Sequence, residues 1–110
     1  QGPGGIIVDE DARGSDIIKI QPAFLDSLNF VECSHKTVRG TIYCKWQRLT
    51  QGVELVIKVP FNLKKCTLVL PEEYNVAGEL MSSMRCDGLN QFYDITNAGD
   101  LRVFLTKTIH

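Results

Sequence analysis

The four cysteines are the side chains of this chain that could take part in the widest range of chemistry. A structural zinc site needs closely spaced ligands, whereas these cysteines are separated by ten residues or more. Only Cys33 and His35 could share one strand face as the start of a metal site, so we expect no metal and no cofactor. Cys44 stands in phase with Ile42 and Trp46, which favours a small buried apolar role.

The even number of cysteines also permits disulfides in an oxidising compartment, and a periplasmic or secreted location would tolerate them. A bond between Cys33 and Cys44 across a hairpin is the easiest to form. Free thiols are the alternative, because a domain with this much apolar strand does not need a covalent link. The sequence therefore does not decide between free thiols and disulfides for Cys33, Cys44, Cys66 and Cys86.

The carboxylates do not form a recognisable catalytic pair. General acid–base catalysis needs two carboxylates facing each other across a cleft, one of them with a pKa raised by burial. Glu72 and Glu73 follow a proline, and Asp9, Glu10 and Asp11 lie in a glycine-rich stretch, so both groups are interpreted as solvated loop charges. No serine or cysteine stands in a nucleophile-elbow motif. We expect no catalytic residue in this chain.

Aromatic side chains could instead bind sugars, because an exposed ring can stack on a sugar face. Trp46 shares the predicted inward face and is expected in the core. Tyr43 points to the other face of its strand, while Tyr74, Phe92 and Tyr93 are expected in loops. These last three are the candidate sugar contacts.

Charge and length exclude several classes of partner. The 12 basic and 13 acidic residues form no run of one sign, so neither nucleic acid nor a membrane is an expected partner. No apolar run approaches the roughly 20 residues of a membrane-spanning helix, and the first residues do not resemble a signal peptide. A chain of 110 residues has room for one core.

Apolar residues recur at every second position through three successive segments, 41–47, 53–59 and 66–70, as they do in half-buried strands. A turn of about five residues joins the first two segments into a predicted hairpin. Further strands are expected at 17–20, at 28–34 and at 101–107. In the second of these, Leu28, Phe30 and Cys33 are expected to turn inward across a bulge.

Strands at roughly ten-residue spacing, with no long amphipathic helix between them, predict an all-β fold: a single antiparallel β-sandwich of about seven to eight strands. Parallel crossovers are not expected. Residues 72–98 are less regular, and residues 77–84 could form a helical turn. Residues 1–16 are interpreted as a connector and residues 17–110 as the sandwich domain.

Three motifs follow one another: VRGTIYCKW at 38–46, VPFN at 59–62 and LP at 70–71. In this order they resemble the C-terminal domain of bacterial α-L-rhamnosidases, in which a strand R-G-x-I-x-x-x-W precedes strands ending in P-x-N and L-P. The departures are Arg13 and Ser15, which flank Gly14 where the family has other residues, and residues 72–98, which we cannot align with the family. The residues that carry the resemblance are Gly40, Ile42, Trp46, Pro60, Asn62 and Pro71.

The resemblance implies a parent enzyme, an inverting glycoside hydrolase whose catalytic acids and rhamnose pocket lie in a preceding α/α barrel. The present chain is then a non-catalytic accessory domain that packs against this barrel through an apolar sheet face or residues 6–8, with residues 1–16 as the connector. The expected partner is the parent enzyme's catalytic domain. Two alternatives stay open: a carbohydrate-binding module for rhamnose-containing glycans, and an independent secreted interaction domain.

Overall fold

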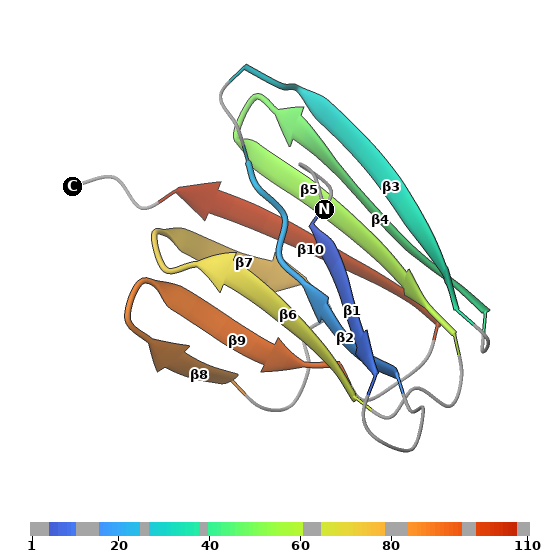
Figure 1. Cartoon of the computed structure of the whole chain (residues 1–110). Helices are drawn as coiled ribbons and strands as arrows, with labels where there is room; N and C mark the ends of the chain where they lie inside the picture. Colours follow the sequence, from blue (N-terminus) through green and yellow to red (C-terminus); the bar gives the residue numbers. More distant parts are fainter. Residues whose placement is uncertain are drawn as a thin grey trace.

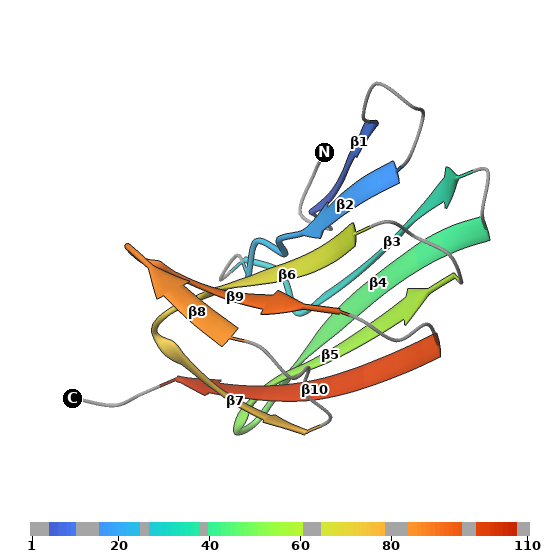
Figure 2. The ribbon, with the colours of Figure 1, turned by 90° about the horizontal axis from the view of Figure 1, so that it is seen from below.

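The computed structural model describes residues 5–10, 16–24, 27–37, 40–60, 65–78, 84–95 and 99–107. Within these ranges the chain forms ten strands in two five-stranded sheets (Figure 1). Figure 2, seen along the layers, shows the two sheets facing each other. The first sheet has the order β1 (Ile6–Glu10), β2 (Asp16–Ile20), β6 (Lys65–Pro71), β9 (Asn90–Asp94) and β8 (Met84–Asp87). The second has the order β3 (Phe30–Thr37), β4 (Gly40–Leu49), β5 (Gly52–Val59), β10 (Gly99–Lys107) and β7 (Tyr74–Gly78).

The all-β sandwich predicted from the sequence is confirmed, and so is the hairpin of β4 and β5. Two features differ from the prediction. The described residues hold more strands than expected, and β2 pairs with β6 in parallel, with Ile18 opposite Cys66. Parallel pairing is feasible because the chain builds β3, β4 and β5 of the other sheet before it returns to lie beside β2. No helix among the described residues could span a membrane.

The predicted connector contributes a strand to the first sheet. β1 pairs antiparallel with β2, from Ile6 opposite Ile20 to Glu10 opposite Asp16. Ile6 and Val8 are partly buried and pack against the core. The domain boundary at residue 17 stays a prediction.

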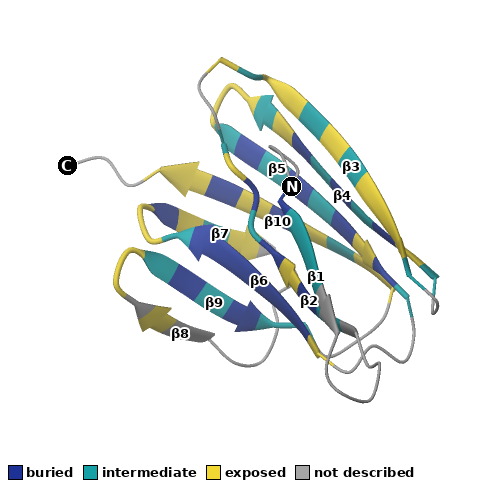
Figure 3. Ribbon diagram, in the orientation of Figure 1, coloured by how far each residue is buried: buried dark blue, intermediate teal, exposed yellow. Residues whose placement is uncertain are grey.

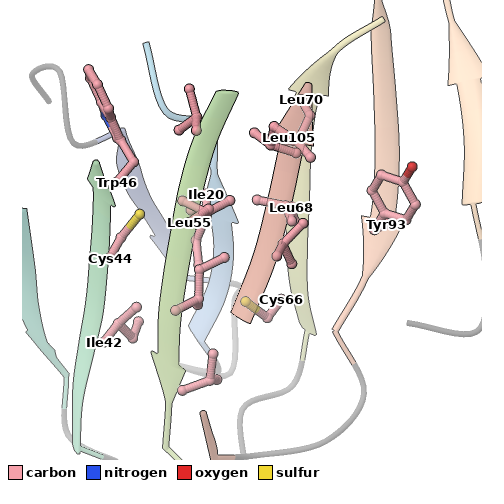
Figure 4. Packing of buried hydrophobic residues seen from close by; sticks show 14 of the residues in the cluster. Ile20, Ile42, Cys44, Trp46, Leu55, Cys66, Leu68, Leu70, Tyr93 and Leu105 are labelled. Atoms are coloured by element: carbon pink, nitrogen blue, oxygen red, sulfur yellow. The ribbon is translucent and has the colours of Figure 1, made fainter. Parts of the chain in front are cut away.

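The core lies between the sheets and is built from alternate positions of their strands (Figure 3). Ile42, Cys44 and Trp46 project from one side of β4, as predicted, and are at most 1% exposed. Figure 4 shows them in one cluster with Leu55 and Leu105 of the same sheet and with Ile20 and Leu68 of the opposite sheet. The ring of Phe24 closes one end of this core, because its centroid lies 5.3 Å from that of Trp46 in an edge-on arrangement. Other core residues are Ile18, Ile20, Leu55, Ile57, Leu68, Leu70, Val103 and Leu105.

Gly40 occupies a position that only glycine fills without strain. Its φ angle is +134°, in a region that side-chain-bearing residues rarely adopt. A Cβ atom at this position would also stand 2.9 Å from Cβ of Pro60. Gly40 is the first residue of β4, and Pro60 follows the last residue of β5. A larger residue at position 40 would therefore collide with Pro60.

β3 differs from its predicted orientation. Its pairing with β4 runs without interruption from Phe30 opposite Gln47 to Thr37 opposite Gly40, so the predicted bulge is wrong. In a regular strand Phe30 and Cys33 must point to opposite faces. Cys33 packs against the core as predicted, whereas Phe30 is 52% exposed.

The structure also corrects the interpretation of residues 72–98. Tyr74 begins β7, and Phe92 and Tyr93 lie within β9, so their predicted loop positions are wrong. The predicted helical turn at 77–84 falls mainly outside the described residues, and its described ends, Ala77 and Met84, belong to strands. Three short strands separated by glycines give too few alternations for the period to be recognised.

Candidate functional site

The outer face of the second sheet, which points away from the core, carries a shallow depression of about 380 Å³. Its floor is Val56 of β5, which stands between Lys45 of β4 and Arg102 of β10 in register. The next row along the strands holds Tyr43, Lys58 and Asp100. The depression forms because a short side chain lies between two long ones that stand up from the neighbouring strands.

The charges around the depression are arranged in loose pairs. Arg102 Nε lies 3.7 Å from Oε2 of Glu54. The Lys58 ammonium lies 5.6 Å from the centroid of the Tyr43 ring, within the range of a cation–π interaction. One partner of each pair, Arg102 or Lys58, is exposed, so each interaction contributes little to stability. The surface can offer hydrogen bonds and one aromatic ring to a ligand.

Tyr43 is held by its hydroxyl group, which donates a hydrogen bond to the carboxylate of Glu32 on β3. This hydrogen bond raises the pKa of Tyr43 to about 12, with a smaller contribution from desolvation. The phenol therefore stays protonated at neutral pH and acts as a donor, not as a base.

The lining of the depression contains one carboxylate, that of Asp100. Inverting glycoside hydrolysis needs two carboxyl groups about 6.5–9.5 Å apart, one as acid and one as base. Among the residues that the structure describes, no three histidine, cysteine, aspartate or glutamate side chains come together to hold a metal ion. The depression therefore has the composition of a polar binding surface.

Three large apolar side chains are exposed on the same outer face, and we call them the apolar rim. Phe30 is 52%, Leu49 40% and Phe104 42% exposed. Phe30 and Phe104 lie in one row across the sheet, which runs through Gln47 and Glu54. Leu49 stands two positions beyond Gln47 on β4, so it shares their face. The rim thus marks the end of the outer face at which β4 finishes.

The structure does not bring the three predicted sugar contacts together. Tyr74 and Tyr93 are only 6% and 5% exposed and belong to the core cluster. Phe92, which is half-buried, lies on the opposite face of β9 from Tyr93. Two of the three rings therefore have no free face for a sugar.

Gln91 links the backbone of Tyr74 to the side chain of Tyr93 by hydrogen bonds. Its side-chain nitrogen donates hydrogen bonds to the carbonyl oxygens of Pro71 at 2.9 Å and Tyr74 at 2.7 Å. Its side-chain oxygen accepts a hydrogen bond of 2.7 Å from the hydroxyl of Tyr93. Burial raises the pKa of Tyr93, with a smaller contribution from Cys86. No pattern in the sequence marked this polar network, because Gln91 follows the turn of a short hairpin that was not predicted.

All four cysteines are free thiols. Cys44 and Cys66 are buried in the core, and burial raises the pKa of each to about 12; Cys33 adds a smaller contribution at Cys44. Burial also raises the pKa of Cys33, although a backbone hydrogen bond from Ile6 opposes the change. Cys86 is exposed. Cys33 and Cys44 are direct cross-strand partners, as the predicted hairpin requires.

Comparison with known proteins places this arrangement in a family. A family model described as the bacterial alpha-L-rhamnosidase C-terminal domain matches residues 8–84, which is more than half of the chain. The chain belongs to this family. The rhamnosidase C-terminal domain is also similar in fold to part of a solved structure, the alpha-L-rhamnosidase from Dictyoglumus thermophilum, with a TM-score of 0.76 at 18% sequence identity. That match covers 96% of this chain but 12% of the other, and the search of curated proteins found no match.

The residues that carried the resemblance have structural positions in this rhamnosidase C-terminal domain. Ile42 and Trp46 are core residues, and Gly40, the first residue of β4, leaves no room for a side chain beside Pro60, which follows β5. Pro71 ends β6, and its carbonyl oxygen accepts the hydrogen bond from Gln91. Asn62 lies outside the described residues.

Proposed function

We propose that this chain is a non-catalytic accessory domain of an α-L-rhamnosidase, and that it packs against and stabilises the catalytic α/α barrel of that enzyme. The enzyme itself would be a glycoside hydrolase that removes terminal α-L-rhamnosides. The observation that carries the proposal is the family match over residues 8–84. The similar rhamnosidase structure, of which an equivalent domain is about one eighth, supports it.

A non-catalytic role is supported by the composition of the outer face. Its depression is lined by a single carboxylate, Asp100, whereas hydrolysis with inversion needs an acid and a base. The Tyr43 hydroxyl is held protonated by Glu32 and cannot serve as that base near neutral pH. We therefore assign the chemistry of the enzyme to another part of it.

A packing role is supported by the apolar rim. Phe30, Leu49 and Phe104 each leave two fifths or more of their surface exposed, although the chain has an ample core in which to bury apolar groups. Exposed apolar side chains grouped on one face are typical of interaction surfaces. We assign this end of the second sheet as the surface that meets the barrel.

The non-catalytic assignment is tested by an activity measurement. The isolated chain is incubated with an aryl α-L-rhamnoside, and release of the aryl alcohol is followed against buffer and against a known α-L-rhamnosidase. We expect the rate with the chain to equal the rate in buffer. Release above the buffer rate that grows with the concentration of the chain would overturn the assignment.

A second candidate function is carbohydrate binding at the depression, and the observation that favours it is the position of Tyr43. Its ring lies on the open face among Lys45, Arg102 and Asp100, which can form hydrogen bonds with sugar hydroxyls. This candidate predicts retention of the chain on an immobilised rhamnose-containing polysaccharide. Retention should be lost in Tyr43→Ala and kept in Thr41→Ala, an exposed neighbour on the same strand. If both variants are retained equally, the depression is not the sugar-binding site. Phe92→Ala then tests Phe92, the one predicted sugar contact that is not in the core.

A further inference from the structure

Cys33 and Cys44 face each other across the two strands at the edge of the second sheet. They are register partners in β3 and β4, and both side chains are on the inner face. Cys44 is 1% exposed, whereas Cys33, on the edge strand, is half-buried. Cys33 is therefore the more exposed of the two residues.

The hydrogen bonds of the hairpin define the spacing of this pair. In antiparallel strands, hydrogen-bonded and non-hydrogen-bonded pairs alternate. The backbone nitrogen of Arg48 donates to the carbonyl oxygen of Asn29 at 2.7 Å, so this pair is hydrogen-bonded. Cys33 and Cys44 lie four positions further along, an even number, and are of the same type. Such pairs have Cα atoms about 5.5 Å apart, within the range that disulfides span.

The two other cysteines have no cysteine partner. Cys66 is buried in β6 of the first sheet and lies opposite Ile18. Cys86 is exposed on β8 and lies opposite Gln91. Four cysteines can form six different pairs, and the fold places only the pair Cys33 and Cys44 opposite each other on neighbouring strands.

We propose that Cys33 and Cys44 are an oxidation site, at which a small-molecule disulfide such as oxidised glutathione converts the two thiols into a disulfide that fastens the edge strand β3 to β4. The Cys33 thiolate attacks one sulfur of glutathione disulfide, forms a mixed disulfide and releases one glutathione thiolate. The Cys44 thiolate then attacks the Cys33 sulfur and displaces the second glutathione thiolate. The protein loses two protons and two electrons, and the oxidant becomes two glutathione thiols.

The order of the steps follows from exposure. The oxidant reaches Cys33, which is half-buried, before Cys44, which is almost fully covered. Because only thiolates attack and burial raises both pKa values, the reaction should be slow at neutral pH and faster in mild alkali. The product closes a short loop, so it should stabilise the domain by restricting the unfolded chain.

The test treats the folded chain with oxidised glutathione at about pH 8.5, near the ordinary thiol pKa. The reaction is stopped with acid, free thiols are alkylated in urea, and tryptic peptides are analysed by mass spectrometry without reductant. We expect peptide 20–36 joined to peptide 40–45, with Cys66 alkylated. Cys33→Ser should abolish the joined peptide, and Cys66→Ser should leave it unchanged.

Two results would overturn the proposal. One is Cys33 recovered only as its glutathione adduct while Cys44 is alkylated. The other is a joined peptide that involves Cys66 or Cys86 instead. The fastening of β3 has its own readout, because the oxidised chain should melt several degrees above the reduced chain, and equal melting temperatures would contradict it.

Discussion

The buried thiols of Cys44 and Cys66 are the residues through which alkaline pH should act on this domain. Each has a pKa of about 12 in the folded chain, raised from 9.0 mainly by burial. Between these values the unfolded chain has lost the protons that the folded chain keeps. Unfolding is therefore favoured as pH rises, while the full stability is present below about pH 9.

We predict that each thiol lowers the free energy of unfolding by about 1.4 kcal/mol per pH unit above pH 9. Urea unfolding under reducing conditions, at several values on either side of pH 9, measures this loss. In the double variant Cys44→Val and Cys66→Val the loss should be much smaller, since neither side chain titrates. An identical loss in the variant and the parent chain would show that other groups are responsible.

Trp46 is a core residue with one unfavourable feature. It is 0% exposed and packs edge-to-face with Phe24, but its indole nitrogen has no hydrogen-bond partner. A buried donor without a partner costs free energy. Trp46→Phe keeps a ring in the core and removes this donor, whereas Trp46→Ala leaves a cavity.

We predict a loss of about 3–5 kcal/mol in the free energy of unfolding for Trp46→Ala. Trp46→Phe should lose clearly less, because part of the cost of the smaller ring is offset by removal of the unpaired donor. Denaturant unfolding of the three chains measures both values. Equal losses in the two variants would mean that the phenyl ring does not fill the space left by the indole.

At the scale of elements, Gln91 joins three strands. Its hydrogen bonds connect β9 to the end of β6 and the start of β7, and β7 belongs to the other sheet. Gln91→Leu would leave two carbonyl oxygens and the Tyr93 hydroxyl without this partner.

We expect Gln91→Leu to destabilise the domain by about 1–3 kcal/mol, the cost of unpaired buried polar groups. Gln47→Leu is the matched control, because Gln47 is exposed on β4 and should change stability little. Hydrogen exchange of the β7 amides gives a local measure. If both variants unfold at the same denaturant concentration as the parent chain, the network contributes nothing.

Apart from the short β2, which its run of isoleucines indicates, the elements that could be predicted from the sequence are those with long alternation. β4, β5, β6 and β10 each run for seven residues or more, so the period of two and the buried set of Ile42, Cys44 and Trp46 were visible. β7, β8 and β9 have four or five residues, and their alternation is too short to separate from a loop. The parallel pairing of β2 with β6 joins strands far apart in the sequence, and the local alternation of apolar residues does not show which strands pair.

The candidate site follows the same division. The outward direction of Tyr43 was predicted, because it depends only on the phase of its strand. The position of Asp100 and Arg102 beside it was not, because β10 pairs with β5 across forty residues of chain. The predicted inward direction of Phe30 is wrong because it assumed a bulge, whereas the pairing of β3 with β4 is unbroken.

At the scale of the whole molecule, the chain is a rhamnosidase C-terminal domain with two unequal surfaces on its second sheet. The inner surface is filled by the core, and the outer one ends in the exposed side chains of Phe30, Leu49 and Phe104. We assign the apolar rim to contact with a catalytic barrel. If the domain has this role, substitutions in the apolar rim should lower the stability of the whole enzyme but change the stability of the isolated domain little.

The most direct test is the melting temperature of the full-length enzyme that carries Phe30→Asp and Phe104→Asp, compared with the same changes in the isolated domain. We predict a fall of several degrees in the enzyme and little change in the domain, because both side chains lie outside the core. Thr41→Asp, an exposed substitution on the same face away from the rim, is the matched control and should affect neither. If the enzyme melts at the same temperature with and without the double substitution, the apolar rim does not stabilise the barrel and the proposed packing role is wrong.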